Sequence, residues 1–387
     1  MSSSTIHVSS RSTAAVGLTL ILGCASAKSG GTLVAVSGSP ALGVDSTGGQ
    51  TEARGPTSDQ YRQALAEAFK EWKGLGEGKN ADYIPALAKV DSGLYGIVLV
   101  TVQGTIYEIG NSKDEFSIQS ISKPFTLARA LEESGLPAVQ ERIGVNATGQ
   151  KFNSILAIEL NNDNKRPPPG NPFVNPGAIA AVDMLVAPTA AQKWDVILGT
   201  YSAFAGRALS VNQEVYKSES ETNLRNRAIS GLLKAYEVIK GDPAEALDLY
   251  TRQCSVSVNA KDLAVMGATL ANGGRNPLSN QQVVSMDTAS RVLAVMATAG
   301  LYETSGDWLA TTGLPAKSGV GGGIVAVLPG RFGIGTFAPP LDEAGNSVRG
   351  QKAIQTIIKR LGGGVFASRA ATRKGAAGPT ASNQGGN

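Results

Sequence analysis

Histidine is nearly absent from this sequence of 387 residues, because the only one, His7, lies in a Ser- and Thr-rich N-terminal stretch. A Ser-His-Asp triad needs a histidine beside its nucleophile, so the sequence argues strongly against that class of hydrolase. The two cysteines, Cys24 and Cys254, are too few for a disulfide framework or a cysteine-rich metal site. Since histidine and cysteine are the usual zinc ligands and no acidic cluster replaces them, the sequence predicts a protein without metal or cofactor.

Charge of either sign is also sparse: 17% of the residues are charged, 42% are hydrophobic and the mean hydropathy is −0.03. These values are typical of a globular protein that is long enough to bury a large core. The net charge of +4 is local, since seven Lys or Arg residues and no acid follow Glu343. Because aromatic residues are not interleaved with these basic ones, we predict no nucleic-acid partner.

The apolar run at residues 14–23 is too short to cross a bilayer, so we expect no stable membrane span. Arg11 precedes the run and Ala25-Ser26-Ala27 follows it, which is the outline of a signal peptide, and Cys24 loosely fits a lipoprotein cleavage site. A disordered extension is the alternative. The predicted organisation is therefore an extension or signal segment at 1–56, a folded domain at 57–366 and a disordered tail at 367–387.

The segment Ser120-Ile121-Ser122-Lys123 offers a serine nucleophile with a base other than histidine. On a helix this spacing puts both side chains on one face, one turn apart. Burial and a helix N-terminus would lower the pKa of the lysine toward neutrality and leave an amine that can accept a proton. A solvated Ser–Lys pair is the alternative reading of so short a motif. The later segment Lys317-Ser318-Gly319 completes the motif pair of penicillin-binding and β-lactamase-like acyl-serine enzymes.

Hydrophobic periodicity predicts the main elements of the fold. These begin with a helix whose apolar residues run from Tyr61 to Trp72, with Ser58 as its N-cap and Gly74 as its stop, followed by a hairpin of 94–102 and 105–109 and a helix from Ser120 to about Leu131. Mostly helices over 177–300, strands over 314–338 and a last helix from Ser347 to Leu361 follow. Strands at both ends with helices between them predict an α+β fold, in which an antiparallel sheet is flanked by helices and a mostly helical lobe is inserted. The two serine–lysine motifs would meet in the cleft between sheet and lobe.

Several distinctive segments occur in one order over nearly the whole folded region. They are FSIQSISKPF (116–125), NPFVNPGAIA (171–180), VYKSE (215–219), LYTRQCS (249–255), GLYETSG (300–306) and GLPAKSGVGGG (313–323). Together these segments resemble the glutaminases, serine-dependent L-glutamine amidohydrolases with a β-lactamase/transpeptidase-like fold. The resemblance implies hydrolysis of L-glutamine to L-glutamate and ammonia through a γ-glutamyl-serine intermediate.

The resemblance also implies roles for single residues. Ser120 would be the nucleophile and Lys123 the base, and Tyr302 or Tyr250 would relay a proton. Positions matching the glutamine site are Ser120, Asn175, Glu219, Asn226, Tyr250, Tyr302, Val320 and Tyr83. The backbone N–H groups of Ser120 and Val320 would form the oxyanion hole, and the glycines after Val320 would let the backbone approach the substrate.

The chemistry of these residue types suits a zwitterionic amino acid. Glu219 would bind the α-ammonium group, while Asn226 and tyrosine hydroxyls would donate to the α-carboxylate. Taken singly, each residue also fits a structural role, such as a half-buried tyrosine, a solvated glutamate or an asparagine cap.

Two stretches depart from the usual family pattern: residues 142–149 read RIGVNATG, and Pro176 stands where alanine is usual. Because proline disfavours helical backbone in the residue before it, we expect Pro176 to press Asn175 toward an extended conformation.

Two other functions stay open at this point: a penicillin-interacting acyl-serine enzyme and a non-catalytic glutamine sensor. Glu219 and Asn226 argue against the first, and the intact Ser120 and Lys123 argue against the second. The resemblance further implies a homodimer or homotetramer located in the cytoplasm, with export as the alternative if residues 1–27 act as a signal.

Overall fold

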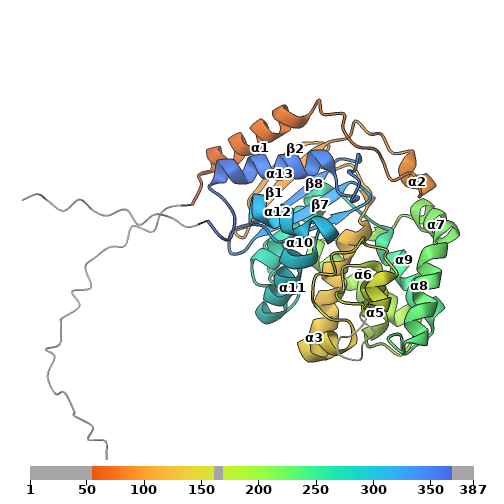
Figure 1. Ribbon diagram of the computed structural model, residues 1–387. Helices are drawn as coiled ribbons and strands as arrows, with labels where there is room; N and C mark the ends of the chain where they lie inside the picture. The colour runs from red at the N-terminus through yellow and green to blue at the C-terminus, as the bar shows by residue number, and fades with distance from the viewer. Residues whose placement is uncertain (1–54, 161–168, 368–387) are drawn as a thin grey trace, which may run out of the picture. The chain divides into compact units, whose positions relative to one another are not determined.

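The computed structural model describes residues 55–160 and 169–367 (Figure 1). Its main sheet is antiparallel with the order β2-β1-β8-β7-β6, so strands from both ends of this region pair directly. The strands are β1 (Gly96–Thr101), β2 (Ile106–Gly110), β6 (Ala316–Gly319), β7 (Gly323–Leu328) and β8 (Phe332–Phe337). This arrangement confirms the predicted hairpin, the predicted strands over 314–338 and the α+β class.

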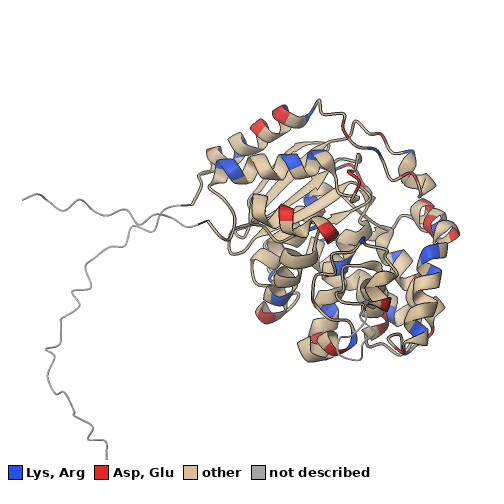
Figure 2. Ribbon diagram, viewed as in Figure 1, with Lys and Arg blue, Asp and Glu red and all other residues tan. Residues whose placement is uncertain are grey.

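Both faces of the sheet are covered by helices. Helices α1 (Ser58–Trp72) and α13 (Val348–Leu361) lie on one face, and α10 (Ala260–Ala271) packs on the other (Figure 1). Side chains of a strand point alternately to the two faces. Ile97 and Leu99 of β1 accordingly join the core under α1 and α13, whereas Val98 and Val100 join the core that includes α10. Lys, Arg, Asp and Glu lie mainly on the helices, and β1, β7 and β8 contain none (Figure 2).

The helical lobe is formed by the segments between β3 and α10. It comprises α3 (Lys123–Arg142), α4 (Leu156–Glu159), α5 (Asn175–Met184), α6 (Ala190–Ala205), α7 (Gln213–Thr222), α8 (Leu224–Ala235) and α9 (Pro243–Cys254). The short α2 (Pro85–Ala88) packs on α7, and α11 (Met286–Ala299) and α12 (Ser305–Thr312) lead back to the sheet. A small sheet of β3 (Phe116–Ser117), β5 (Val256–Val258) and β4 (Ser210–Val211) joins the segment just before Ser120 to the lobe.

Helix boundaries agree with the prediction where capping residues define them. α13 is capped by Ser347, whose hydroxyl accepts from the Gly350 N–H, and it ends at Gly362 with φ 92°. At the first helix the predicted cap Ser58 is wrong by one residue, because Thr57 and Gln60 form a reciprocal capping box.

The helix predicted from Ser120 to Leu131 is divided and longer. A 3-10 turn, η1 (Gln119–Ser122), carries Ser120, and α3 then continues to Arg142 with a kink at Gly135, where φ is 74°. Pro124 stands in the first turn of α3, where a missing N–H costs no helical hydrogen bond.

The predicted signal segment at 1–27 and the residues after 367 lie outside the described residues. Within the described ranges, no helix combines the length and the apolar character that a bilayer crossing requires.

Substituting Gly335 of β8 with Ala should destabilise the protein. A Cβ atom there would lie 2.1 Å from the carbonyl oxygen of Ala260 and 2.6 Å from the backbone nitrogen of Ala264, so α10 would have to move away from the sheet. We expect a loss of about 3 kcal/mol in urea unfolding. The control Gly231→Ala on α8 meets no atom within 4 Å and should stabilise by about 0.5 kcal/mol. Equal stabilities of the two variants would contradict this packing.

Candidate active site

A small cavity of about 100 Å³ lies between the segment that carries Ser120 and the helical lobe. Seven of the predicted site residues line it, namely Tyr83, Ser120, Asn175, Glu219, Asn226, Tyr250 and Val320. Lys123 and Tyr302 lie against this group, because the Lys123 amine contacts Asn175 and the Tyr302 ring packs on the cavity residue Phe152. The structure thus brings together every residue that the sequence placed in the site.

Ser120 lies on η1, immediately before α3. Its residue is 7% exposed, and its hydroxyl is close enough to the Tyr302 phenol to lower the pKa of that group. The preceding residue, Gln119, has a left-handed φ of 50°, which is uncommon outside glycine. Such backbone strain is common at functional sites, where the surrounding structure holds it.

Lys123 is only 1% exposed, and it has no carboxylate partner among the described residues. Its Nζ donates to the carbonyl oxygen of Phe173 at 2.9 Å and to Oδ1 of Asn175 at 2.7 Å. Burial lowers the pKa of Lys123 from 10.5 to about 7, although the nearby Glu219 carboxylate opposes the shift. A large share of this amine is therefore neutral at physiological pH.

Asn175 connects the lysine to the substrate side of the cavity. Its Oδ1 also accepts from the Tyr250 hydroxyl at 3.0 Å, and its Nδ2 donates to Oδ1 of Asn226 at 3.1 Å. These bonds fix which way the amide faces. The expectation that Pro176 presses Asn175 into an extended conformation is wrong. Asn175 is the first residue of α5, and a proline fits the first helical turn.

Glu219 is a buried carboxylate that lines the cavity. Burial raises its pKa to about 7, while a hydrogen bond from Gln119 and the charge of Lys123 pull the pKa down. Nε2 of Gln119 donates to Oε2 of Glu219 at 3.2 Å and to the Ser117 hydroxyl at 3.2 Å. An incoming ammonium group would favour the ionised carboxylate, because an opposite charge stabilises it.

Tyr302 lies between two buried lysines. Nζ of Lys317 is 3.9 Å from the ring centroid and Nζ of Lys123 is 5.6 Å from it. Burial raises the pKa of the Tyr302 phenol well above its ordinary value, and the neighbouring Ser120 hydroxyl offsets a part of that rise. The Tyr302 hydroxyl is buried without a partner in hydrogen-bond geometry, and its backbone φ is 56°.

The turn that carries Val320 lies directly against the nucleophile segment. A Cβ atom on Gly321 would be 2.5 Å from the Ser117 carbonyl oxygen, and one on Gly319 would be 2.9 Å from that of Ile118. These glycines therefore bring the turn against the chain before Ser120. The N–H groups of Ser120 and Val320 have no acceptor within the described part of the chain, so both are free to bind an oxyanion.

Some lining residues were not predicted. Gln119, Asn153 and Arg225 border the cavity, and Nε of Arg225 donates to the Asn153 carbonyl oxygen at 2.7 Å. The position of Arg225, directly before the predicted site residue Asn226, was the feature of the sequence that could have identified it. Residues 142–149, which depart from the family pattern, do not line the cavity. The carbonyl oxygen of Asn146 accepts a hydrogen bond from the Asn171 side chain, whose oxygen in turn accepts from the Phe173 N–H in the turn before α5.

Tyr83 is 53% exposed at the edge of the cavity, on the segment that leads into α2. Across the described ranges, no group of three or more His, Cys, Asp or Glu side chains is placed to hold a metal ion.

Comparison with known proteins agrees with this architecture. A family model described as Glutaminase matches residues 78–366. A glutaminase of Colwellia psychrerythraea is 52% identical over 314 residues, which cover 81% of this chain and 100% of that protein. A solved structure described as a probable glutaminase has a TM-score of 0.79 and 46% identity, covering 81% of this chain and 100% of the other. A probable glutaminase from Bacillus subtilis complexed with 6-diazo-5-oxo-L-norleucine has a TM-score of 0.67 and 31% identity, covering 80% and 94%.

These neighbours define the fold as an α+β protein of the β-lactamase-like class. The chain belongs to the glutaminase family and is an enzyme of that class.

Replacing Lys123 with Met should stabilise the protein more at about pH 7 than at about pH 9. The folded-state pKa of Lys123 is about 7, below its ordinary value of 10.5. The unfolded chain therefore binds more protons in this window, and wild-type stability rises with pH, whereas the variant lacks this contribution. The excess should be about 2 kcal/mol in urea unfolding. The control is Lys113→Met at an exposed lysine. If the free energy of unfolding of Lys123→Met changed with pH in the same way as that of the wild type, a lowered pKa of Lys123 would be refuted.

Proposed function

We propose that this enzyme hydrolyses the side-chain amide of L-glutamine to L-glutamate and ammonia, with Ser120 as nucleophile and Lys123 as base. The observation that carries the proposal is the buried Lys123 amine, which has two neutral acceptors and no carboxylate partner among the described residues. It follows Ser120 by one helical turn, and Ser120 lines the cavity. Membership of the glutaminase family supports the reaction.

The cavity suits a small zwitterion. A volume of about 100 Å³ is well below the several hundred Å³ typical of sites for drug-sized ligands. In the proposed complex Glu219 accepts from the α-ammonium group, and Asn226 and Arg225 donate to the α-carboxylate. The side-chain amide then reaches Ser120, with its carbonyl oxygen between the free N–H groups of Ser120 and Val320.

In the first half of the reaction, neutral Lys123 takes the proton of Ser120 as Oγ bonds to the amide carbon. The resulting oxyanion is held by the two N–H groups, each typically worth about 3 kcal/mol of barrier. The carbon–nitrogen bond then breaks, and the nitrogen leaves as ammonia with a proton that originates from the Lys123 ammonium group. A γ-glutamyl ester remains on Ser120.

In the second half, Lys123 is neutral again and takes a proton from water as the water oxygen attacks the ester carbon. Ser120 leaves and recovers its proton from Lys123, and glutamate departs. The Tyr302 hydroxyl is the proposed relay between Lys123 and the leaving nitrogen, because it is buried and has no competing hydrogen bond. Tyr250 is the second candidate, although its hydroxyl already donates to Asn175.

Ser120→Ala should abolish ammonia release from L-glutamine. We expect a loss on the order of a thousand-fold or more in kcat, because no nucleophile remains to form the ester. The measurement is an ammonia assay beside a thermal unfolding curve, with Ser134→Ala further along α3 as the control. Normal turnover by Ser120→Ala in a folded protein would exclude the proposed nucleophile.

A nitrocefin hydrolysis assay on the wild type separates this function from that of a penicillin-interacting enzyme. We expect no turnover, because the cavity is small and Glu219 provides a counter-ion for an amino group. A non-catalytic glutamine sensor would instead bind L-glutamine without releasing ammonia.

The kcat/KM of the wild type should rise with pH through a midpoint near neutrality. The working forms are neutral Lys123, whose pKa is lowered to about 7, and ionised Glu219, whose pKa is raised to about 7. Protonation inactivates both groups, so activity is lost as pH falls, and the apparent midpoint belongs to the pair because their charges interact. Enzyme held in acid and returned to neutral buffer should recover fully. A limb that begins only above about pH 9 would be incompatible with a neutral buried amine.

A further inference from the structure

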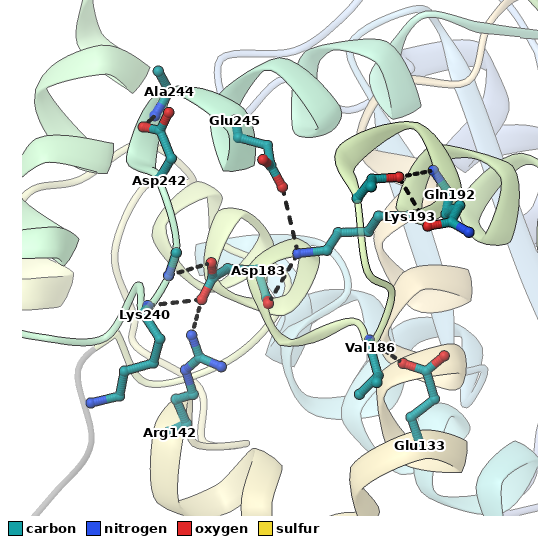
Figure 3. Close-up of polar contacts among 12 residues, drawn as sticks. Glu133, Arg142, Asp183, Val186, Gln192, Lys193, Lys240, Asp242, Ala244 and Glu245 are labelled. Atoms are coloured by element: carbon teal, nitrogen blue, oxygen red, sulfur yellow. Dashed lines mark hydrogen bonds and ion pairs between the residues drawn. The ribbon is translucent and has the colours of Figure 1, made fainter.

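Asp183 is a buried carboxylate outside the cavity that has no part in the proposed chemistry. Its side chain is 5% exposed and forms an ion pair with the Arg142 guanidinium. The same carboxylate accepts the backbone N–H groups of Lys240 at 2.9 Å and Gly241 at 3.1 Å (Figure 3). We call Asp183, Arg142, Lys240 and Gly241 the Asp183 cluster.

The Asp183 cluster joins the far ends of the elements that meet in the active site. Arg142 is the last residue of α3, Asp183 is in the last turn of α5, and Lys240 and Gly241 precede α9. At their other ends α3 begins with Lys123 and α5 begins with Asn175.

The Lys123 amine donates to Asn175, and Tyr250 of α9 donates to the same oxygen. The three helices are thus connected twice, once through Asn175 and once through Asp183. From Asn175 to Asp183 the α5 axis spans about 12 Å, a short and rigid distance.

The loop before α9 is shaped to reach this carboxylate. A Cβ atom on Gly241 would lie 2.7 Å from Oδ1 of Asp183, so a larger residue would push the loop away. Nε of Arg142 also donates to the Val238 carbonyl oxygen at 2.6 Å, which ties the start of the same loop to α3. On the other side, Lys193 donates to the Asp183 carbonyl oxygen at 3.4 Å and lies 3.9 Å from Glu245 of α9 (Figure 3).

We propose that Asp183 is a positioning residue of this enzyme, which holds α5 and α9 so that Asn175 keeps its hydrogen bonds from Lys123 and Tyr250. The inference rests on the proposed role of Lys123 as the base. Loss of the carboxylate releases the end of α5 and the loop before α9, and the Asn175 amide then shifts relative to the Lys123 amine. Displacement of a catalytic group by about 1 Å costs up to a hundred-fold in rate.

The test variant is Asp183→Asn, which keeps the shape but removes the charge. An amide has one acceptor oxygen, so it cannot serve both loop N–H groups together with Arg142. The control is Asp287→Asn, which removes the charge from a carboxylate that pairs with Arg291 one helical turn away on the exposed surface of α11. Turnover of L-glutamine is measured against pH, well below the unfolding temperature of each variant.

We expect Asp183→Asn to lower kcat on the order of ten-fold and to move the acid limb of kcat/KM to higher pH, because a looser site hydrates Lys123. Five titratable groups face that lysine, and the substitution replaces none of them: Glu219 of α7, Tyr250 and Cys254 of α9, Lys317 of β6 and Tyr302 of the 3-10 turn η2 (Tyr302–Thr304). Asp287→Asn should leave both kcat and the limb unchanged.

The inference is overturned if folded Asp183→Asn keeps both its kcat and the acid limb of its kcat/KM and only its unfolding temperature falls. The Asp183 cluster would then stabilise the fold without positioning the site. If Asp183→Asn does not fold, Arg142→Lys is measured in the same way. An acid limb of kcat/KM that stays at the wild-type pH in that variant also overturns the inference. Lys123→Met separates the two proposals: full turnover in that variant refutes Lys123 as the base, whatever Asp183→Asn does.

Discussion

The site depends on one hydrogen bond, from Nζ of Lys123 to Oδ1 of Asn175 at 2.7 Å. Both acceptors of the lysine are neutral oxygens, so burial is not offset by an ion pair and the pKa falls to about 7. A carboxylate in place of the amide would hold the proton on the lysine. The amide is therefore the feature that leaves Lys123 without an ion pair, as its proposed role as a base requires.

The same amide extends the constraint through the lobe. Because Asn175 also contacts Tyr250 and Asn226, its orientation is set from α8 and α9 as well as from α3. Close to Ser120, small residues let the Val320 turn touch the Ser117 carbonyl oxygen. Ser120 is thus held between a polar network and a close backbone contact, and the left-handed backbone of Gln119 and Tyr302 is kept in place by that enclosure.

Much of the architecture could be predicted because the relevant signals are local. The last helix has its cap, its apolar face and its terminal glycine within one stretch, and its bounds agree. The strands over 314–338 alternate with clear turns and were also predicted correctly. The sheet of β3, β5 and β4 was missed, because its strands of two or three residues are too short to show a period. The length of α3 was underestimated because Gly135 and Pro137 suggest an end where the chain only kinks.

Residue types alone determined the kind of chemistry. One histidine in a terminal stretch leaves a lysine as the available base for Ser120, and the ordered motifs point to one family. Only the tertiary structure decided the surroundings of that lysine, because the groups that accept its hydrogen bonds lie 50 and 52 residues away in the chain. The pKa of a buried amine depends on the distances and charges around it, and a linear sequence contains neither.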